Sequence, residues 1–220
     1  MQLSRDGAQL HAGALTPDHL DKLEQALAGV PAGRPGTRLS GIPALAELLL
    51  ADGPIGPIPA SILGDRARPV RALLFNKTEA QNWALGWHQD RTIAVRERVE
   101  TPGFANWTVK SGMLHVEPPF ELLERMLTVR VHLDPVSEAN APLIVAPGSH
   151  SLGKIPEAEI ALTVQRLGTL TCLAERGDIW LYATPILHAS EAAAEPAARR
   201  VLQVDYSADQ LAGMLEWDGF

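Results

Sequence analysis

Apolar and polar residues alternate with a period of two through much of the chain between residues 69 and 206, which predicts a series of short β-strands. The clearest example runs from Leu127 to Asp134, where the alternation holds over the full length. Glycine and proline separate the runs, as expected for strands that are joined by turns. The other predicted strands cover residues 70–77, 83–90, 143–146, 169–173, 178–182 and 199–206.

The first third of the chain has a helical pattern instead. Thr16 can cap a helix that begins at Pro17, because a threonine hydroxyl accepts a hydrogen bond from the first turn and proline is favoured at the first helical position. Three leucines form the apolar stripe of this helix: Leu20, Leu23 and Leu27. We predict further helices at 42–50, 120–126 and 155–164, a loop at 30–40 and an extended or turning path at 53–59.

Helices followed by many short strands favour one mainly β domain over residues 1–220. We expect a double-stranded β-helix, the jelly roll of cupin-like proteins, over residues 69–206. A helical flank over residues 1–68 would precede it, and further helices would be inserted between its strands. A chain of 220 residues can bury one sizeable core but is short for two.

Composition narrows the functional classes. A formal net charge of −7 without clustered Lys and Arg argues against nucleic acid as a partner. No apolar run approaches the roughly 18 residues of a membrane span, and the N-terminal residues lack the pattern of a secretion signal. The one cysteine, Cys172, excludes an internal disulfide and fits a reducing compartment. We therefore expect a cytoplasmic protein with a small-molecule partner, and the sequence indicates no oligomeric state.

A histidine and an aspartate stand two residues apart in the run GWHQDRT at 86–92. Side chains at i and i+2 of a strand share a face, roughly 6.5–7 Å apart, so His88 and Asp90 could bind one metal ion. With a third ligand from another strand they would occupy one face of an octahedron, which is typical of non-haem Fe(II) oxygenases. His132 and Asp134 form a second pair with the same spacing, and an ordinary polar patch is a third interpretation.

Several short motifs follow one another in a fixed order along the second half of the chain. They are LLFNK at 73–77, WHQD at 87–90, Asn140, APGSH at 146–150, GDIWL at 177–181, HAS at 188–190 and RRVL at 199–202. This ordered set, from Leu73 to Tyr206, resembles the phytanoyl-CoA dioxygenase family of Fe(II)- and 2-oxoglutarate-dependent oxygenases. The chain departs from the family at Ala141, where the family usually has glycine.

The resemblance implies a role for each matching residue. His88, Asp90 and His188 match the family's iron ligands and hence its catalytic centre. Arg199, eleven residues past His188, matches the arginine that binds the far carboxylate of 2-oxoglutarate. The other positions that match the cosubstrate pocket are Ser190, Gln89, Leu73 and Arg130.

Alternation alone leaves open whether Arg199 or Arg200 binds that carboxylate. A planar guanidinium pairs bidentately with a carboxylate, so either arginine has suitable chemistry. Arg200 shares its strand face with the more apolar residues, which points it toward a core, whereas the family spacing favours Arg199. The two sets are Arg199, Val201, Gln203 and Asp205, and Arg200, Leu202, Val204 and Tyr206.

The segment from residue 91 to residue 126 is longer than in the family members with which we compare it. An insertion after the metal strand would lie at the cavity mouth and act as a lid. Trp107 within the insertion and Trp87 before it are candidate substrate contacts, although packing in the core or the loop explains them equally.

The resemblance implies an enzyme that uses Fe(II), 2-oxoglutarate and O₂ to hydroxylate or otherwise oxidise a small-to-medium organic substrate, with release of succinate and CO₂. One alternative is a cupin-like metal enzyme that uses no 2-oxoglutarate. Another is a non-catalytic relative that binds a small molecule. The sequence does not name the primary substrate, because one fold serves many substrates.

Overall fold

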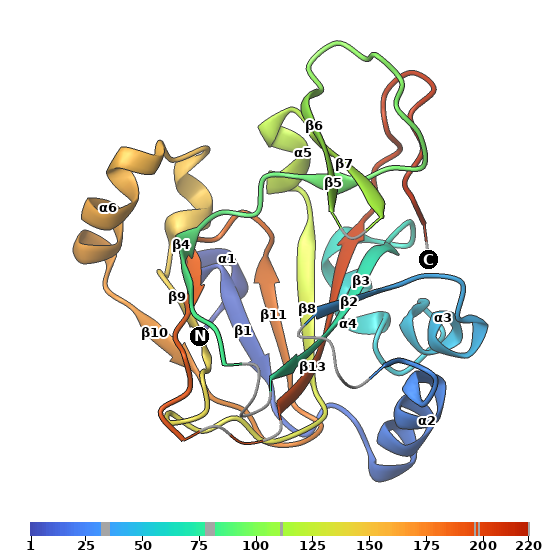
Figure 1. Ribbon diagram of the computed structural model, residues 1–220, viewed down its shortest axis with the longest axis vertical. Coiled ribbons are helices and arrows are strands. Elements are labelled where there is room, and N and C mark those ends of the chain that lie inside the picture. Colours follow the sequence, from blue (N-terminus) through green and yellow to red (C-terminus); the bar gives the residue numbers. More distant parts are fainter. Residues whose placement is uncertain (32–35, 78–81, 111, 196, 198, 220) are drawn as a thin grey trace.

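The computed structural model describes residues 1–31, 36–77, 82–110, 112–195, 197 and 199–219. Two antiparallel sheets form its centre, and Figure 1 shows them between helices on either side. The larger sheet has six strands in the order β1 (Ala8–His11), β11 (Ile179–Ala183), β8 (Leu127–His132), β13 (Arg199–Ser207), β3 (Arg68–Lys77) and β2 (Gly36–Leu39). The smaller sheet has four, in the order β10 (Leu170–Cys172), β9 (Leu143–Val145), β12 (His188–Ser190) and β4 (Leu85–His88). Strands that are distant in sequence pair throughout, as the predicted jelly roll requires.

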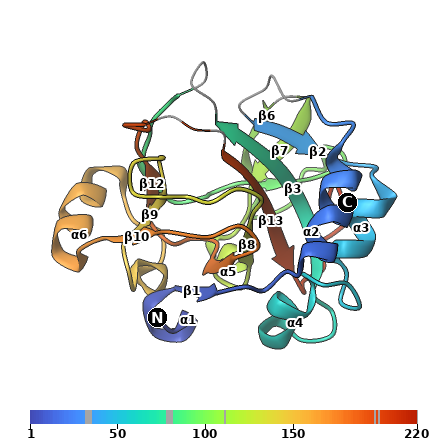
Figure 2. The same ribbon diagram turned by 90° about the horizontal axis from the view of Figure 1, so that it is seen from below.

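Helices cover the outer sides of both sheets. Figures 1 and 2 both place α2 and α3 on one side of the molecule and α6 on the other. The helices are α1 (Leu3–Asp6), α2 (Pro17–Leu27), α3 (Pro43–Leu49), α4 (Pro57–Leu63), α5 (Phe120–Glu124) and α6 (Ile160–Leu167), with 3₁₀ turns at Ser149–Leu152 and Glu157–Glu159. In the described part of the chain, none of them combines the length and apolarity needed to cross a bilayer.

The capping pattern of α2 agrees with the sequence prediction. The Thr16 hydroxyl accepts a hydrogen bond from the backbone N–H of His19 at 3.3 Å, and the His19 ring accepts one from the Thr16 N–H. This reciprocal cap satisfies two of the backbone donors that every helix start leaves unpaired. The apolar stripe of α2 is buried, and Leu23 is wholly inaccessible.

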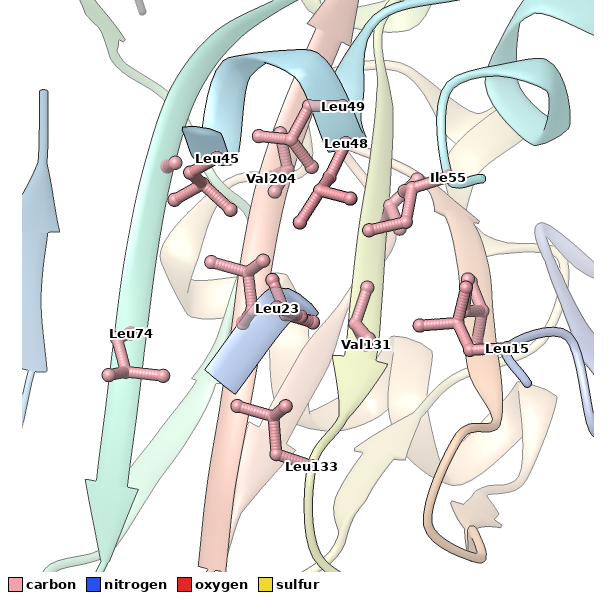
Figure 3. Packing of buried hydrophobic residues seen from close by; sticks show 14 of the residues in the cluster. Leu15, Leu23, Leu45, Leu48, Leu49, Ile55, Leu74, Val131, Leu133 and Val204 are labelled. Carbon is pink, nitrogen blue, oxygen red and sulfur yellow. The ribbon is translucent and has the colours of Figure 1, made fainter. Parts of the chain in front are cut away.

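The main hydrophobic core lies on the outer face of the larger sheet, between the sheet and the helices that cover it. Figure 3 shows Leu23 of α2 and three leucines of α3 packed over Leu74, Val131 and Val204 of the sheet. Truncating a buried leucine in such a core costs about 2–5 kcal/mol, so this layer is a large part of the folding energy. Because side chains alternate across a strand, the same strands turn their remaining residues toward the smaller sheet. That inner face carries the polar residues described below.

The predicted insertion forms a third small sheet together with α5. Its strands lie in the order β5 (Ile93–Ala94), β7 (Met113–Glu117) and β6 (Ala105–Lys110), at the upper end of the molecule in Figure 1. Residue 111 lies outside the described residues. Val95 also bridges to Trp217, so the C-terminal segment packs on this sheet.

Two local predictions are wrong in part. The predicted loop at 30–40 contains β2, although residues 32–35 lie outside the described part, and β2 is held by its pairing with β3 rather than by a strong strand pattern of its own. The predicted extended or turning path at 53–59 does turn over residues 53–56, but its last three residues begin α4. Pro57 takes the first helical position and Pro59 also lies in the first turn, where proline needs no N–H donor. Cys172 is buried on β10, as expected for a small apolar side chain.

Candidate functional site

Three potential metal ligands from distant parts of the sequence converge at one end of the smaller sheet. Antiparallel pairing of β12 with β4 sets His188 directly opposite His88, and their ring centroids lie 4.3 Å apart. Asp90 follows two residues after His88, and one ligand atom from each of the three lies within 4.8 Å of the others. Among the described residues, no other three His, Cys, Asp or Glu side chains are gathered in this way.

Both imidazoles are oriented by the backbone of their own strands. Nδ1 of His88 donates to the carbonyl oxygen of Gly86 at 2.8 Å, and Nδ1 of His188 donates to that of Ile186 at 2.9 Å. Each ring therefore keeps its Nε2 lone pair free for a metal, which is the usual arrangement of metal-binding histidines. Burial also lowers the pKa of His188 to about 4, so this ring is neutral and able to coordinate at pH 7.

Asp90 is held in its charged form by an arginine from the larger sheet. Burial by itself would raise the pKa of Asp90, but Arg71 and the two histidines lower it overall. Nη2 of Arg71 lies 3.7 Å from Asp90 Oδ2, and its Nε donates to Asp205 Oδ2 at 2.5 Å. Thr128 donates to the other oxygen of Asp205 at 3.1 Å. Two neutral nitrogens and one carboxylate oxygen on one side of a site suit Fe(II) with its remaining positions open.

The triad opens into a cavity of about 450 Å³ between the two sheets. Its described lining contains one carboxylate, Asp90, and six cationic side chains. These are Arg38, Arg71, Lys77, Lys110, Arg130 and Arg199. A larger depression of about 840 Å³ lies against the C-terminal segment 210–219 and includes no member of the triad. The chemistry of the site therefore belongs to the smaller, positively charged cavity.

Three of these cations form what we call the inner cluster: Lys77, Arg130 and Arg199. Lys77 and Arg199 are opposite each other in the β3–β13 register, and Arg130 donates to Gln203 Oε1 at 3.0 Å. The Nε atoms of both arginines are buried without a hydrogen-bond partner among the described residues. Burial, together with the neighbouring arginines, lowers the pKa of Lys77 to about 8. Buried donors without partners, which also repel one another, indicate a place for an anion.

The backbone at Ala141 contributes to the same end of the cavity. Its carbonyl oxygen accepts hydrogen bonds from Arg199 Nη1 and, at 3.3 Å, from Ser190 Oγ. Ala141 has a φ of 50°, in the left-handed region where glycine is favoured. The departure from the family's glycine therefore falls on a residue whose unusual conformation aims an acceptor at Arg199.

The two arginines that the sequence left open point in opposite directions. Arg199 faces the cavity and is 3% exposed. Arg200 points outward, where it forms ion pairs with Asp134 at 2.7 Å and with Glu24 of α2 at 3.0 Å. The second His-x-Asp pair is divided between the faces as well, because Asp134 is paired with Arg200 while His132 is buried on the inner side.

The other residues singled out from the sequence divide into two groups. Leu73, Ser190 and Arg130 line the cavity, whereas Gln89 does not. Gln89 bonds backbone groups at Gly153, Ile155 and Pro185 instead. The candidate tryptophans also lie outside the lining: Trp87 packs against the cluster around Ala146 and Leu187, and Trp107 packs in the core of the insertion with Arg98 over its ring.

Four of the cationic cavity residues were absent from the sequence prediction. Lys77 and Arg71 were detectable, because period two on β3 sets both on the same face as Leu73. Arg38 on β2 and Lys110 at the end of β6 carried no such signal, since each reaches the cavity only through long-range pairing of short strands.

Comparison with known structures shows the same fold. EctD from S. alaskensis, with 2-oxoglutarate and 5-hydroxyectoine, has 19% identity and a TM-score of 0.70, over 99% of this chain and 77% of that one. AviO1 from Streptomyces viridochromogenes Tue57 has 17% identity and a TM-score of 0.64, over 97% and 95% of the two chains. HygX from Streptomyces hygroscopicus, with nickel and 2-oxoglutarate, has 16% identity and a TM-score of 0.62, over 93% and 84%. No curated protein matches the sequence.

The fold and the triad are those of a class of jelly-roll proteins with two histidines and one carboxylate at a metal site. The chain belongs to the phytanoyl-CoA dioxygenase (PhyH) family, whose model matches residues 3–201. It is accordingly an Fe(II)- and 2-oxoglutarate-dependent oxygenase. The predictions of the family, the fold and the cofactors Fe(II), 2-oxoglutarate and O₂ are confirmed, and the alternatives without 2-oxoglutarate or without catalysis are not favoured.

Proposed function

We propose that His88, Asp90 and His188 hold the iron and that the enzyme hydroxylates a small-to-medium organic substrate, with release of succinate and CO₂. The observation that carries this proposal is the convergence of three ligand atoms within 4.8 Å at the wall of a cationic cavity. Bound iron supplies the redox chemistry that couples decarboxylation of 2-oxoglutarate to oxidation of the substrate. His88, Asp90 and His188 would hold this iron at the wall of the cavity, where a substrate in the cavity would meet it.

The inner cluster has the chemistry to hold the far carboxylate of 2-oxoglutarate. Arg199 offers a planar guanidinium, and its Nε has no partner among the described residues. Lys77 donates to Ser190 Oγ at 3.2 Å and thus orients that hydroxyl at the same end of the cavity. Arg130 stacks over the Phe75 ring at 5.5 Å, where it adds positive charge between Arg199 and the metal triad.

The insertion at 91–126 is proposed as a lid-like wall within one domain of residues 1–220. Two of its side chains, Thr92 and Lys110, line the cavity, and they lie 3.3 Å apart. Such a wall excludes water and strengthens the electrostatic interactions inside the site. We also keep the prediction of a cytoplasmic protein with a small-molecule partner and no nucleic acid, supported by the unpaired Cys172 and the net charge of −7.

Anaerobic titration with Fe(II) and 2-oxoglutarate, followed in the visible region, tests the ligand assignment. The chelate gives a weak metal-to-ligand absorption band, which the wild type should show and which His88→Ala, Asp90→Ala and His188→Ala should each abolish. The matched control is Asp134→Asn in the second His-x-Asp pair, which should keep the band. A band that persists in the triad variants, or that never forms in the wild type, overturns the assignment.

A further inference from the structure

The cavity contains more positive charge than iron and 2-oxoglutarate can neutralise. Six cationic side chains line it, while the only carboxylates near them in the described residues are Asp90 and Asp205, the partner of Arg71. The charges of Fe(II) and of the 2-oxoglutarate dianion cancel each other, so an excess of four positive charges remains. Unpaired charge in a cavity between two sheets is costly, and it favours the binding of an anion.

The cations occupy three levels of the larger sheet. Lys77 and Arg199 are paired at one level and Arg71 lies at another, while Arg38 and Arg130 share the intermediate level of Leu73 and Gln203. Lys77 of the inner cluster lies six residues along β3 from Arg71, which corresponds to roughly 20 Å of strand. Arg71 is beside Asp90, and the charges of Arg38 and Lys110 act on this end of the cavity. Arg71, Arg38 and Lys110 therefore form a second group, whose charges act on one another beside the metal triad.

Within the second group, Arg71 is already paired but two neighbours are not. Arg71 contacts both Asp205 and Asp90. Arg38 and Lys110, which we call the outer pair, form no ion pair with any described residue. Among the described residues, the buried Nε of Arg38 has no hydrogen-bond acceptor, and the exposed Lys110 ammonium has only the Thr92 hydroxyl, at 3.3 Å, as a partner. The two side chains therefore have donors from which an anion can accept hydrogen bonds.

We propose that the primary substrate is an organic anion whose carboxylate or phosphate group binds the outer pair, Arg38 and Lys110. This inference rests on the proposed function, because it assigns the substrate class of that same site. The outer pair and the triad line one cavity of about 450 Å³, so an anion held there keeps the rest of a small molecule inside the space that the metal also faces. Lys110 comes from the insertion, which gives the lid-like wall a part in recognition.

The test uses the full-length protein loaded with Ni(II) and saturating 2-oxoglutarate, so that the cosubstrate site is filled and no turnover occurs. Isothermal titration calorimetry then measures the binding of benzoate and of phenyl phosphate, with benzamide as the uncharged analogue. We expect the wild type to bind at least one anion about tenfold more tightly than benzamide, since a hydrogen bond to a charged group has that order of effect. Benzoate and phenyl phosphate together show which anionic group the outer pair prefers.

Arg38→Gln and Lys110→Gln should each lower the affinity for the preferred anion about tenfold and leave the binding of benzamide unchanged. The matched controls are Arg98→Gln and Lys154→Gln, whose side chains are largely exposed and outside the cavity lining. Both controls should keep the preference for the anion.

Each remaining outcome overturns the inference in a recognisable way. A wild type that does not prefer an anion over benzamide, or controls that lose the preference equally, would show that the outer pair is not an anion site. An Arg38→Gln protein that loses 2-oxoglutarate binding would assign Arg38 to the cosubstrate site instead. If wild-type protein does not bind 2-oxoglutarate at all, the proposed function fails first, which the visible titration reports separately.

Discussion

Replacing Arg71 with methionine should destabilise the protein by about 3–5 kcal/mol, because it removes one partner of a buried ion pair. Arg71 is 8% exposed and Asp205 is 2% exposed, so the carboxylate left behind has no access to water. The loss is larger than that of a surface pair, which contributes at most about 1 kcal/mol. Asp90 loses its neighbouring guanidinium at the same time.

A double-mutant cycle separates the ion pair from the packing of the arginine stem. Arg71→Met leaves the charge of Asp205 without a partner, and Asp205→Asn removes that charge. The double variant should therefore lose less stability than the two single variants lose in sum, by up to about 3 kcal/mol. A divalent metal should also stabilise Arg71→Met more than the wild type, because the metal then supplies the positive charge that Asp90 has lost.

Urea unfolding followed by tryptophan fluorescence measures these differences, first with EDTA and then with Ni(II). Arg71→Lys is the matched control: it retains the charge but not the planar fork, and should fall between the wild type and methionine. If Arg71→Met unfolds within about 1 kcal/mol of the wild type in EDTA, or if the cycle shows no coupling, Arg71 does not act as the countercharge of these carboxylates.

Three further changes probe the inner face, and Arg200→Gln on the outer face is the control for the first of them. Arg199→Gln should weaken 2-oxoglutarate binding about ten- to a hundredfold in the visible titration, whereas Arg200→Gln should leave it unchanged and cost about 1 kcal/mol or less in urea unfolding. Ala141→Gly should raise stability by up to about 1 kcal/mol, because relief of the left-handed φ exceeds the entropy that glycine adds to the unfolded chain; a loss of stability would contradict this. Burial lowers the pKa of His132 to about 3. Below pH 6.5 this histidine is therefore protonated in the unfolded state but not in the folded state. The free energy of unfolding should fall by about 1.4 kcal/mol for each pH unit below 6.5. His132→Leu should remove that share of the pH dependence in urea unfolding, and an unchanged slope would refute it.

Period-two alternation predicted which residues of a strand share a face, but not which face is turned to the cavity. On β13, the apolar set of Leu202, Val204 and Tyr206 is buried against the helices outside the sheet. Arg199 and Gln203 of the more polar set line the cavity. A naive assignment of the apolar face to the interior would have selected Arg200. The choice depends on α2 and α3, whose packing on the sheet is a tertiary fact that no strand pattern contains.

The same rule could have corrected one of the sequence predictions. Alternation puts His88 and Asp90 on one face and therefore sets Gln89 on the other. The resemblance to the family nevertheless put Gln89 in the cosubstrate pocket, whereas the structure has it bonding backbone groups near α6. At this position the structure follows the strand geometry. His188 lies beside His88 as the resemblance implied, although no local pattern connects the two residues.

The residues proposed to bind substrate are those that the sequence was least able to indicate. Arg38 lies on a four-residue edge strand within a segment predicted to be a loop, and Lys110 lies at the end of a hairpin strand in the insertion. Neither segment has a pattern strong enough to place it, since short strands depend on their partners for stability. The net charge of −7 argues against the binding of a large polyanion, because a polyanion interacts with much of the protein surface. A small anion interacts only with the residues around the cavity. An acidic protein with a cationic cavity is therefore suited to select small anions from solution while its surface repels larger ones.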